Sequence, residues 1–341
     1  MILANLAYWQ STLIRVVLVL VAVLIPAGTF VYVFLFKMMS FMQSRLGPME
    51  AGPYGSLQLM AEVGKFLQKE DIVPERADRH LFKFAPYLVV GSVLLVYVVI
   101  PFGPDAYFAN LDTGIFYALA VSSVSVIGIL VAGWASANKY SLMGGLRAAG
   151  QLIAYELPMV LAVVGVVIQA GSLNLSQIVG AQANGEMFGL GALGNPFILT
   201  QIVGFGLFLL ASQAELTQAP FDMPVAESEL VSGYMTEYSG LRFLLFFIGE
   251  FASAGAFAAL AATLYLGGWW LPGLDLDANY MNVVGPLVVL GKMMVVAFLI
   301  FWFRFTYPRF REDQLQTLAW KYLIPLALVN IMATAVLKVV F

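Results

Sequence analysis

Eight long apolar runs constrain what this chain of 341 residues can fold into. A helix needs about 20 mostly apolar residues to cross the hydrocarbon core of a bilayer. The runs have about that length and cover residues 12–36, 81–101, 114–134, 151–171, 197–215, 241–268, 285–305 and 318–340. Charged residues make up only 11% of the chain, against about 25% in soluble domains. The sequence therefore predicts an all-α polytopic membrane protein, a single membrane domain over 1–341 with eight transmembrane helices.

Connections that carry Lys or Arg alternate with connections that carry neither. The connections after the first, third and seventh runs carry Lys or Arg, whereas those after the second, fourth and sixth carry none. Because basic residues are retained on the cytoplasmic side of a membrane, the basic connections are predicted to be cytoplasmic and both termini to lie outside. The connection after the fifth run then also lies on the cytoplasmic side, although it contains no Lys or Arg.

The first cytoplasmic connection contains a short amphipathic segment, GSLQLMAEVGKFLQKE, at 55–70. Its apolar residues share one face at helical spacing: Met60, Val63 and Leu67. Its charged residues share another face: Glu62, Lys65 and Lys69. This pattern predicts an amphipathic helix at the cytoplasmic membrane interface. The alternative is an ordinary surface helix that packs on protein.

The connection after the fifth run is an acidic loop at 214–238, AELTQAPFDMPVAESELVSGYMTEY. It holds five carboxylates: Glu215, Asp222, Glu227, Glu229 and Glu237. Pro220 and Pro224 forbid a continuous helix through the loop. The broken backbone falls at the membrane edge, where its free polar groups need protein or water partners.

The spacing of these acids predicts that they are not all ionised. Glu229 and Glu237 stand eight residues apart, in a segment that can resume a helix and would then place them on one face. Like charges held close together cannot all ionise at ordinary pKa values. We therefore expect at least one acid of the loop to keep its proton. The alternative is a solvated acidic loop that docks a basic partner.

Ionisable side chains also interrupt the apolar runs themselves. Glu156, Glu250 and Lys292 lie within the fourth, sixth and seventh runs, and Glu215 closes the fifth. Each such residue costs about 2.5–3.5 kcal/mol to insert into a membrane and is therefore a functional suspect. The acids favour a path for protons through the membrane. The alternative is structural pairing, for example of Glu250 with Lys292.

Two residue types that carry metal and redox chemistry are scarce. The chain contains no Cys and a single His, His80. This excludes disulfides, Cys-ligated clusters and a zinc site built from several His residues within the chain. No iron–sulfur cluster, flavin or metal is predicted for it.

Four segments together resemble a known family. They are RLGPMEAGPYGSLQLMAEVGKFLQKE at 45–70, GWASANKYSLMGGLRAAGQLIAYE at 133–156, the acidic loop, and RFREDQLQTLAWKYLIPLALVN at 309–330. They are similar, in order and at family spacing, to the H subunit of NADH-quinone oxidoreductase, the respiratory complex I family whose mitochondrial relative is subunit 1. The resemblance covers nearly the whole chain, and APFDMPVAESELVSGY is its most specific motif.

The resemblance implies a fold, a place and partners. The fold would have eight spanning helices with both termini outside, in the inner (plasma) membrane of a bacterium. The subunit would join the membrane arm to the peripheral arm and form much of the chamber in which quinone, the substrate (ubiquinone or menaquinone), is reduced. Its partners would be peripheral iron–sulfur and quinone-site subunits, small membrane-arm and antiporter-like subunits, and lipid, but no nucleic acid. It would not be catalytic alone.

The resemblance also implies roles for particular residues. The implied proton path consists of Glu215, Asp222, Glu227, Glu229, Glu156 and Glu250. The residues implied to border the quinone chamber are Arg45, Met60, Lys65, Phe221, Gln218 and Phe36. Arg147 matches an arginine of the family in the connection between the third and fourth helices.

The chain departs from the family pattern at clustered positions. Charged residues of the family are replaced at Leu35, Phe36, Gln218, Val225 and Ser123, and Glu50 stands where an Arg is usual. Both acids and bases are affected. Since removing one member of an ion pair alone is costly, we infer that paired charges were lost together.

Other functional classes remain as alternatives. One is the homologous subunit of a membrane-bound hydrogenase or another complex I-like assembly with a different electron donor. A second is a stand-alone ion or solute transporter, against which the lack of a visible internal repeat weighs. A third is a purely structural anchor, which does not explain why acids that are costly to insert are present.

Overall fold

The computed structural model describes residues 8–185, 194–272 and 280–340, and these residues form helices and no strands. The first helix, α1 (Tyr8–Phe30), continues through a π-helical segment η2 (Val31–Met38) into α2 (Met39–Met42). The short η3 (Pro53–Gly55) and α3 (Gln58–Gln68) follow before α4 (Arg79–Tyr97). The next elements are α5 (Gly114–Ser122), α6 (Val124–Ala135), α7 (Lys139–Ala170) and α8 (Leu175–Asn184).

The second half of the chain begins with the short α9 (Phe197–Thr200) and α10 (Ile202–Glu215). The acidic loop contains only α11 (Glu227–Leu230) and η5 (Gly233–Met235) before α12 (Gly240–Tyr265). The last elements are α13 (Met281–Thr306), α14 (Glu312–Thr317), η6 (Leu318–Leu323) and α15 (Ile324–Val340).

Seven helices within the described residues are long and apolar enough to cross a membrane. They are Val16–Met42, Arg79–Tyr97, Gly114–Ala135, Lys139–Ala170, Gly240–Tyr265, Met281–Thr306 and Glu312–Val339. The predicted span 197–215 is instead divided into α9 and the shorter apolar helix α10. The 14 residues of α10 measure only about 21 Å at 1.5 Å per residue. The eighth span and the orientation of the termini therefore remain predictions.

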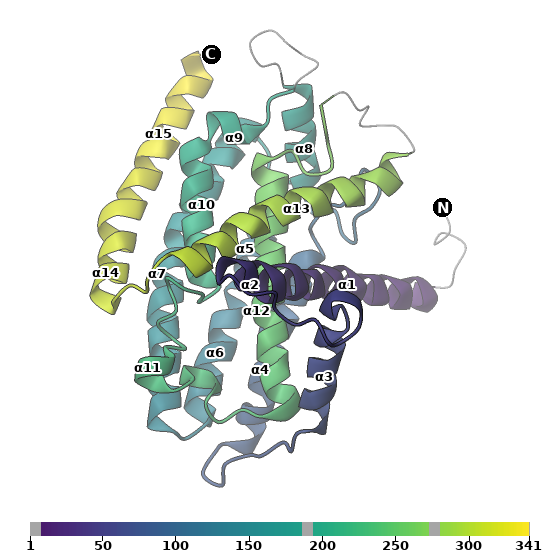
Figure 1. Cartoon of the computed structure of the whole chain (residues 1–341). Coiled ribbons are helices and arrows are strands. Elements are labelled where there is room, and N and C mark those ends of the chain that lie inside the picture. Colours follow the sequence, from purple (N-terminus) through teal and green to yellow (C-terminus); the bar gives the residue numbers. More distant parts are fainter. Residues whose placement is uncertain (1–7, 186–193, 273–279, 341) are drawn as a thin grey trace.

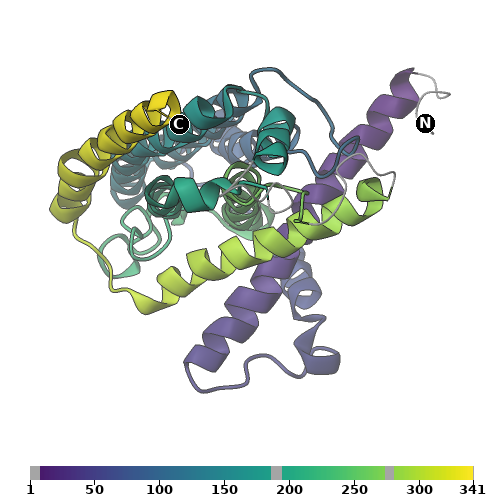
Figure 2. The ribbon, with the colours of Figure 1, turned by 90° about the horizontal axis from the view of Figure 1, so that it is seen from above.

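The helices form a bundle that two of them cross obliquely. In Figure 1, α7, α10 and α12 run along the bundle, whereas α1 and α13 lie across it. Seen from above, α15 lies on the opposite side of the bundle from α1 (Figure 2). Both α1 and α13 pack on α12. Helix α12 is therefore the central element, and all but eight of its 26 residues are buried.

Small residues allow close contacts where α7 meets its neighbours. A Cβ atom added to Gly133 would lie 2.6 Å from the Ser141 carbonyl oxygen of α7. One added to Gly144 would lie 2.7 Å from the Cα atom of Gly233, in the acidic loop. Such glycine contacts are typical of helix packing in membranes. Here they place the acidic loop directly against the backbone of α7.

The span predicted as 114–134 is broken at Ser123, between α5 and α6. Hydroxyl groups on both sides of the break bond backbone carbonyl oxygens. Ser122 donates to the Leu119 oxygen at 2.8 Å, and Ser125 donates to the Ser122 oxygen at 2.7 Å. Serine side chains compete with the backbone ladder in this way, and they satisfy groups that the break would leave unpaired inside a membrane.

The predicted amphipathic segment 55–70 contains the helix α3 (Gln58–Gln68), and its apolar residues divide between two surroundings. Leu59, Val63 and Phe66 line a cavity against α1 and α12. Met60 is 73% exposed and Leu67 is 62% exposed. The helix therefore packs on protein with one part of its apolar face and leaves the other part free for a membrane interface.

A polar cluster joins α15 to the break between α9 and α10. Gln201, at the break, donates to the hydroxyl of Thr334 at 2.6 Å and accepts from the amide of Asn330 at 2.9 Å. Gln201 is buried. The polar side chain that interrupts the predicted span is therefore satisfied by α15, a helix more than 100 residues further along the sequence.

We predict that Gln201→Ala lowers the free energy of unfolding by about 1–3 kcal/mol, because Asn330 and Thr334 lose a buried partner. Thermal unfolding of the purified protein in detergent measures this change. Met332→Leu, at an exposed position of the same helix α15, is the matched control. If Gln201→Ala unfolds at the same temperature as this control, the cluster does not hold α15.

Candidate functional site

The acidic loop does not resume a long helix after its prolines. It contains the four-residue helix α11 and then turns at η5. The prediction that Glu229 and Glu237 share one helical face is therefore wrong. Glu237 accepts a hydrogen bond from Asn138 at the start of α7, whereas Glu229 lies among arginines. The physical reason is Val231, which directly follows α11 and has a φ of +66°, a backbone conformation that cannot continue a right-handed helix.

Arginines from other parts of the chain neutralise Glu229. Arg147 of α7 donates from Nη1 to Glu229 Oε2 at 2.5 Å, and Arg309 bonds the other carboxylate oxygen. The hydrogen bond from Arg147, with the nearby charge of Arg309, holds the pKa of Glu229 below its usual value. Glu229 is thus not the acid of the loop that keeps a proton. The bases that the acidic loop lacks come from α7 and from the connection before α14.

Asp222 has the opposite character. It lies in the loop between α10 and α12, and burial raises its pKa from 3.8 to about 6. Arg309 and Arg304 oppose the rise, while Glu250 adds to it. Because a group that titrates near neutral pH can both bind and release a proton, Asp222 is the acid of the loop best placed to exchange one.

Glu250 is paired, but not with the residue considered from the sequence. It accepts hydrogen bonds from Arg304 Nη1 at 3.0 Å and from Gln218 Nε2 at 2.9 Å. Lys292 instead donates to the carbonyl oxygens of Leu266, at 2.6 Å, and Gly268, at 2.8 Å. The alternative pair of Glu250 with Lys292 is therefore wrong, because Lys292 satisfies carbonyl groups just past the end of α12.

Arg304 is the residue of this site that the sequence pattern does not single out. From the sequence it counts only among the basic residues that set the orientation. Its guanidinium lies 5.7 Å from the Phe251 ring centre and 6.0 Å from that of Phe301, within the range of cation–π attraction. The available signal is its position, since it is the basic residue nearest the end of the seventh apolar run.

Glu156 and Glu215 lie deeper in the bundle. The hydroxyl of Ser123, at the break between α5 and α6, donates to Glu156 Oε1. The Glu215 carboxylate lies beside a small cavity whose lining includes four serines, and the charge of Glu156 acts on it. The structure therefore brings these two predicted acids close together. The serine break, by which we mean the interruption at Ser123 between α5 and α6 with its flanking serines, lies beside them.

The PFDMP segment is held in place by backbone contacts. Gln151 of α7 donates to the carbonyl oxygens of Ala214 and Phe221, both at 2.8 Å. The Phe310 amide donates to the Pro220 oxygen at 3.0 Å. Phe221 itself is buried, with its ring centre 5.2 Å from that of Tyr155. These contacts satisfy the polar backbone that the prolines set free.

The other residues expected around a quinone chamber are spread over three parts of the chain. Phe36 is buried in η2, and Gln218 is buried against Glu250. Arg45, Met60 and Lys65 are exposed near or within α3. Because the structure places these five in three separate parts of the chain, their shared role remains a prediction.

An apolar cavity of about 220 Å³ lies between α1, α3 and α12. Its lining includes Leu24 and Val31 of the first helix and its π-helical extension, Phe66 of α3, and Phe251 of α12. Glu62 of α3 is the one ionisable residue in its lining, and it accepts a hydrogen bond from Gln58 at 3.0 Å. Phe251 connects this cavity to Arg304 and so to the acids around Glu250.

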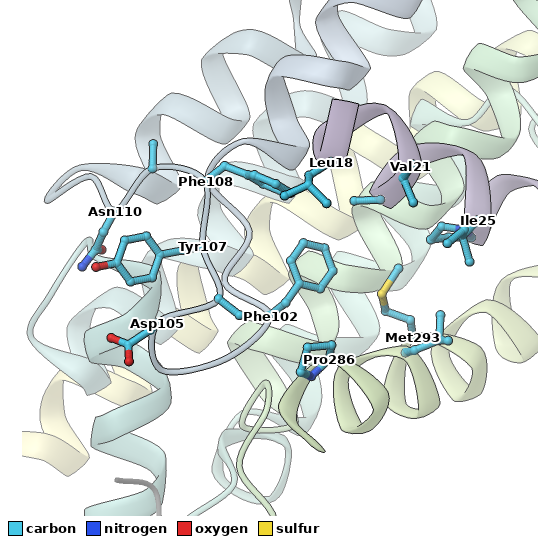
Figure 3. A pocket seen from close by; sticks show the side chains of 15 residues that line it. Leu18, Val21, Ile25, Phe102, Asp105, Tyr107, Phe108, Asn110, Pro286 and Met293 are labelled. Atoms are coloured by element: carbon cyan, nitrogen blue, oxygen red, sulfur yellow. The ribbon is translucent and has the colours of Figure 1, made fainter. Parts of the chain in front are cut away.

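A larger cavity, of about 1000 Å³, lies elsewhere, between α1, the segment 102–110 and α13. Figure 3 shows Leu18 of α1 facing Phe108, with Phe102 between them and Pro286 of α13. Asp105 contributes the one carboxylate, and it accepts from Asn282 at 3.3 Å. None of the predicted site residues lines this cavity.

These observations define a class: a polytopic helical membrane protein that holds carboxylates inside its bundle and binds an acidic loop through arginine salt bridges. A family model described as NADH dehydrogenase matches residues 14–335. The H subunit of the NADH-quinone oxidoreductase of Brevibacillus brevis is 44% identical over 330 residues, 96% of this chain and 94% of the relative. The chain therefore belongs to the family of NADH-quinone oxidoreductase H subunits, as its motifs predicted.

Other relatives of the same name agree. Those of Bacillus thuringiensis subsp. konkukian and Bacillus cereus (strain AH187) are each 46% identical over 306 residues, 89% of this chain and 87% of theirs. Family membership makes the chain a membrane subunit of an NADH-quinone oxidoreductase, with the other subunits of that complex as partners. With bacterial relatives and seven spanning helices among the described residues, it is a multi-pass protein of the plasma membrane.

We predict that Arg147 and Glu229 are coupled by about 1 kcal/mol at low salt, since the pair is partly exposed. The coupling should weaken in high salt. Because the folded-state pKa of Glu229 is lowered, the coupling is present above the ordinary value of 4.5 and is lost as the pH falls through the folded-state pKa. A double-mutant cycle with Arg147→Gln and Glu229→Gln, followed by thermal unfolding in detergent, measures it.

The pair of Arg311 with Asp313 is the control for this cycle. Its atoms lie 3.3 Å apart, and its side chains are 82% and 69% exposed. We expect coupling near zero there. Equal coupling in the two pairs would contradict a specific role for Arg147.

We predict that Asp222 titrates near pH 6 in the assembled complex. Infrared difference spectra recorded across pH should show a carboxyl signal with this midpoint, which Asp222→Asn removes. Arg309→Gln should move the midpoint to higher pH, because the arginine favours the ionised form.

Because the folded-state pKa of Asp222 is raised, its contribution to the free energy of unfolding grows as the pH falls from 6 toward 3.8. This contribution disappears in Asp222→Asn. Asp313→Asn is the control and should leave the signal unchanged.

Proposed function

We propose that this subunit forms the quinone-binding chamber of a proton-pumping NADH-quinone oxidoreductase and couples quinone reduction to proton translocation. One observation carries the proposal. Arg304 lies beside Phe251, which lines the apolar cavity under α3, and the same guanidinium bonds Glu250. The cavity that suits an apolar quinone tail is thus joined through Arg304 to Glu250 of α12, and both of these charges act on Asp222 of the acidic loop.

The chemistry of the substrate fits this connection. Reduction of a quinone to a quinol takes two electrons and two protons, and a partly reduced quinone carries negative charge. In the proposal an iron–sulfur cluster of a partner subunit supplies the electrons. This chain supplies an apolar cavity, a cation in Arg304 that attracts the developing charge, and acids that exchange protons.

The magnitude of the effect selects Asp222 as the responding acid. One charge about 10 Å away, at an effective dielectric constant near 20, contributes about 1.7 kcal/mol, a little more than one pKa unit. That moves a group with a pKa of about 6 to near neutrality. It does not protonate Glu229, whose pKa is lowered by Arg147. In the proposed path Glu229 therefore holds the loop, and protons pass by way of Asp222 and Glu227.

The inner members of the proposed path are Glu215 and Glu156. The charge of Glu250 acts on Asp222. Glu215 closes α10, at the start of the acidic loop, and the charge of Glu156 acts on it. These interactions support a sequence of acids from the loop into the bundle, toward partner subunits of the membrane arm.

A complex I-like assembly with a different electron donor is the second candidate. The observation in its favour is Gln218, which stands where the family resemblance expects an Arg and bonds Glu250 at 2.9 Å. In this chain Arg304 provides the cation next to Glu250 instead. Purification of the assembly discriminates the two, because NADH-oxidising subunits would accompany one and nickel–iron hydrogenase subunits the other.

We predict that Arg304→Gln lowers quinone reductase activity of the assembled complex by about tenfold and raises the KM for quinone. The change leaves Glu250 without its charged partner, which typically costs 2–5 kcal/mol in buried pairs. Steady-state kinetics with a soluble quinone measure both parameters. Arg311→Gln, at an exposed arginine nearby in the sequence, is the control. If Arg304→Gln assembles normally and its KM for quinone is unchanged, the apolar cavity between α1, α3 and α12 does not bind quinone in the way proposed.

A further inference from the structure

A small polar cavity of about 20 Å³ lies inside the bundle, among α4, α5, α6, α10 and α12. Four serines and one carboxylate contribute its polar lining: Ser92, Ser122, Ser125, Ser253 and Glu215. The rest of its lining is apolar. Four hydroxyl groups from three different parts of the chain therefore converge on one buried acid.

The acid needs a partner that its neighbours do not provide. Glu215 Oε1 is shielded from solvent and has no hydrogen-bond partner among the described residues. Buried polar atoms are nearly always paired with protein or with ordered water, and leaving one unpaired destabilises the folded state. The position therefore requires a group that can hydrogen-bond this oxygen.

The protons of three serines are already used. Ser92 donates to the Val89 oxygen at 2.8 Å, and Ser122 and Ser125 donate to carbonyl oxygens at the break between α5 and α6. A hydroxyl has one proton and two lone pairs, so these three oxygens can only accept from the cavity. Of the four serine hydroxyls that line the cavity, only that of Ser253 makes no hydrogen bond to the described part of the chain.

The lining thus presents several acceptors and one free hydroxyl to a space of molecular size. A water molecule matches this set, because it donates twice and accepts twice. It can donate to Glu215 Oε1 and to a serine oxygen while it accepts from Ser253. If Glu215 is protonated, the same water accepts from it. A cavity needs about 10–15 Å³ to hold one water, and the 20 Å³ here suffices for one.

We propose that this cavity binds one ordered water molecule, which links Glu215 to the serine break between α5 and α6 and thereby to Glu156. The break places hydroxyls on two sides. Ser122 and Ser125 line the cavity, and Ser123 donates to Glu156. Ser123 also stands where the family resemblance expects a Glu. A hydroxyl and a water together therefore span a position that a carboxylate would otherwise occupy.

The consequence for transport rests on the proposed function. In net terms, Glu215 gives up one proton and Glu156 gains one, and the water and the serines end the transfer as they began it. The serines are positioning residues in this scheme. They fix the water, and the acids bind and release the proton.

The test begins with a high-resolution map of the assembled wild-type complex. The expected result is one ordered density within hydrogen-bonding distance of Glu215 and Ser253. The absence of such density, with the side chains well defined, overturns the proposal. This measurement requires no variant and does not depend on turnover.

Variants then test the role of the water. Ser253→Val fills the cavity, and Ser92→Ala removes an acceptor but retains the space. We expect Ser253→Val to abolish the density and to lower the number of protons moved per electron by severalfold, with a smaller loss in Ser92→Ala. Unchanged proton movement in Ser253→Val without the density would overturn the link to Glu156.

Ser212→Ala is the matched control. Like Ser92, Ser212 is buried on an apolar helix and donates to the carbonyl three residues earlier, at 2.9 Å, but it does not line the cavity. It lies one turn from Glu215, so general packing changes near that acid would appear in it as well. A loss in Ser212→Ala equal to that in Ser92→Ala would overturn the specific role of the cavity.

Failure of the proposed function would look different. If Glu215→Gln moved protons normally, the proton path would fail, yet the wild-type density could still be present. If Arg304→Gln kept its KM for quinone, the proposed quinone chamber would be refuted, yet the wild-type density at the water site could still be present. The water site and the function it would serve are therefore tested by separate measurements.

Discussion

The cost of an unpaired charge in a water-poor interior governs this structure. Glu250 sits in the central helix α12 and is tolerated because Arg304 and Gln218 both donate to it. Lys292 is tolerated because backbone carbonyls just past the end of the same helix accept from it. Each charge is satisfied by a segment distant in sequence, so the arrangement of α12, α13 and the acidic loop follows from the need to bring these partners together.

The acids of the loop divide into two kinds for the same reason. Glu229 is surrounded by arginines and stays ionised, so it acts as a fixed attachment of the loop to α7. Asp222 is withdrawn from water, which raises its pKa toward the physiological range. A loop with both kinds can remain in place while one of its members changes protonation. That division suits a device in which a chemical event must alter charge without unfolding its surroundings.

The sequence predicts the features that depend on local pattern, and misses those that depend on partners. Hydropathy predicts the long helices, and helical spacing predicts α3. The run 197–215 predicts one span, although Gln201 divides it by bonding Asn330 and Thr334 of a distant helix. The partner of Glu250 could not be identified in advance, because Arg304 and Lys292 are both bases of the same helix α13 and only packing decides which one reaches it.

The contact between Gly144 and Gly233 has a mechanical consequence. No side chain separates the backbone of α7 from that of the acidic loop at this point, since even one Cβ atom would collide there. Side chains can absorb a small displacement by changing rotamer, but two backbones in direct contact cannot. A displacement of the loop at Gly233 would therefore require the backbone of α7, the helix that carries Glu156, to move with it. The two glycines therefore form a rigid backbone contact between the acidic loop and the helix that carries Glu156.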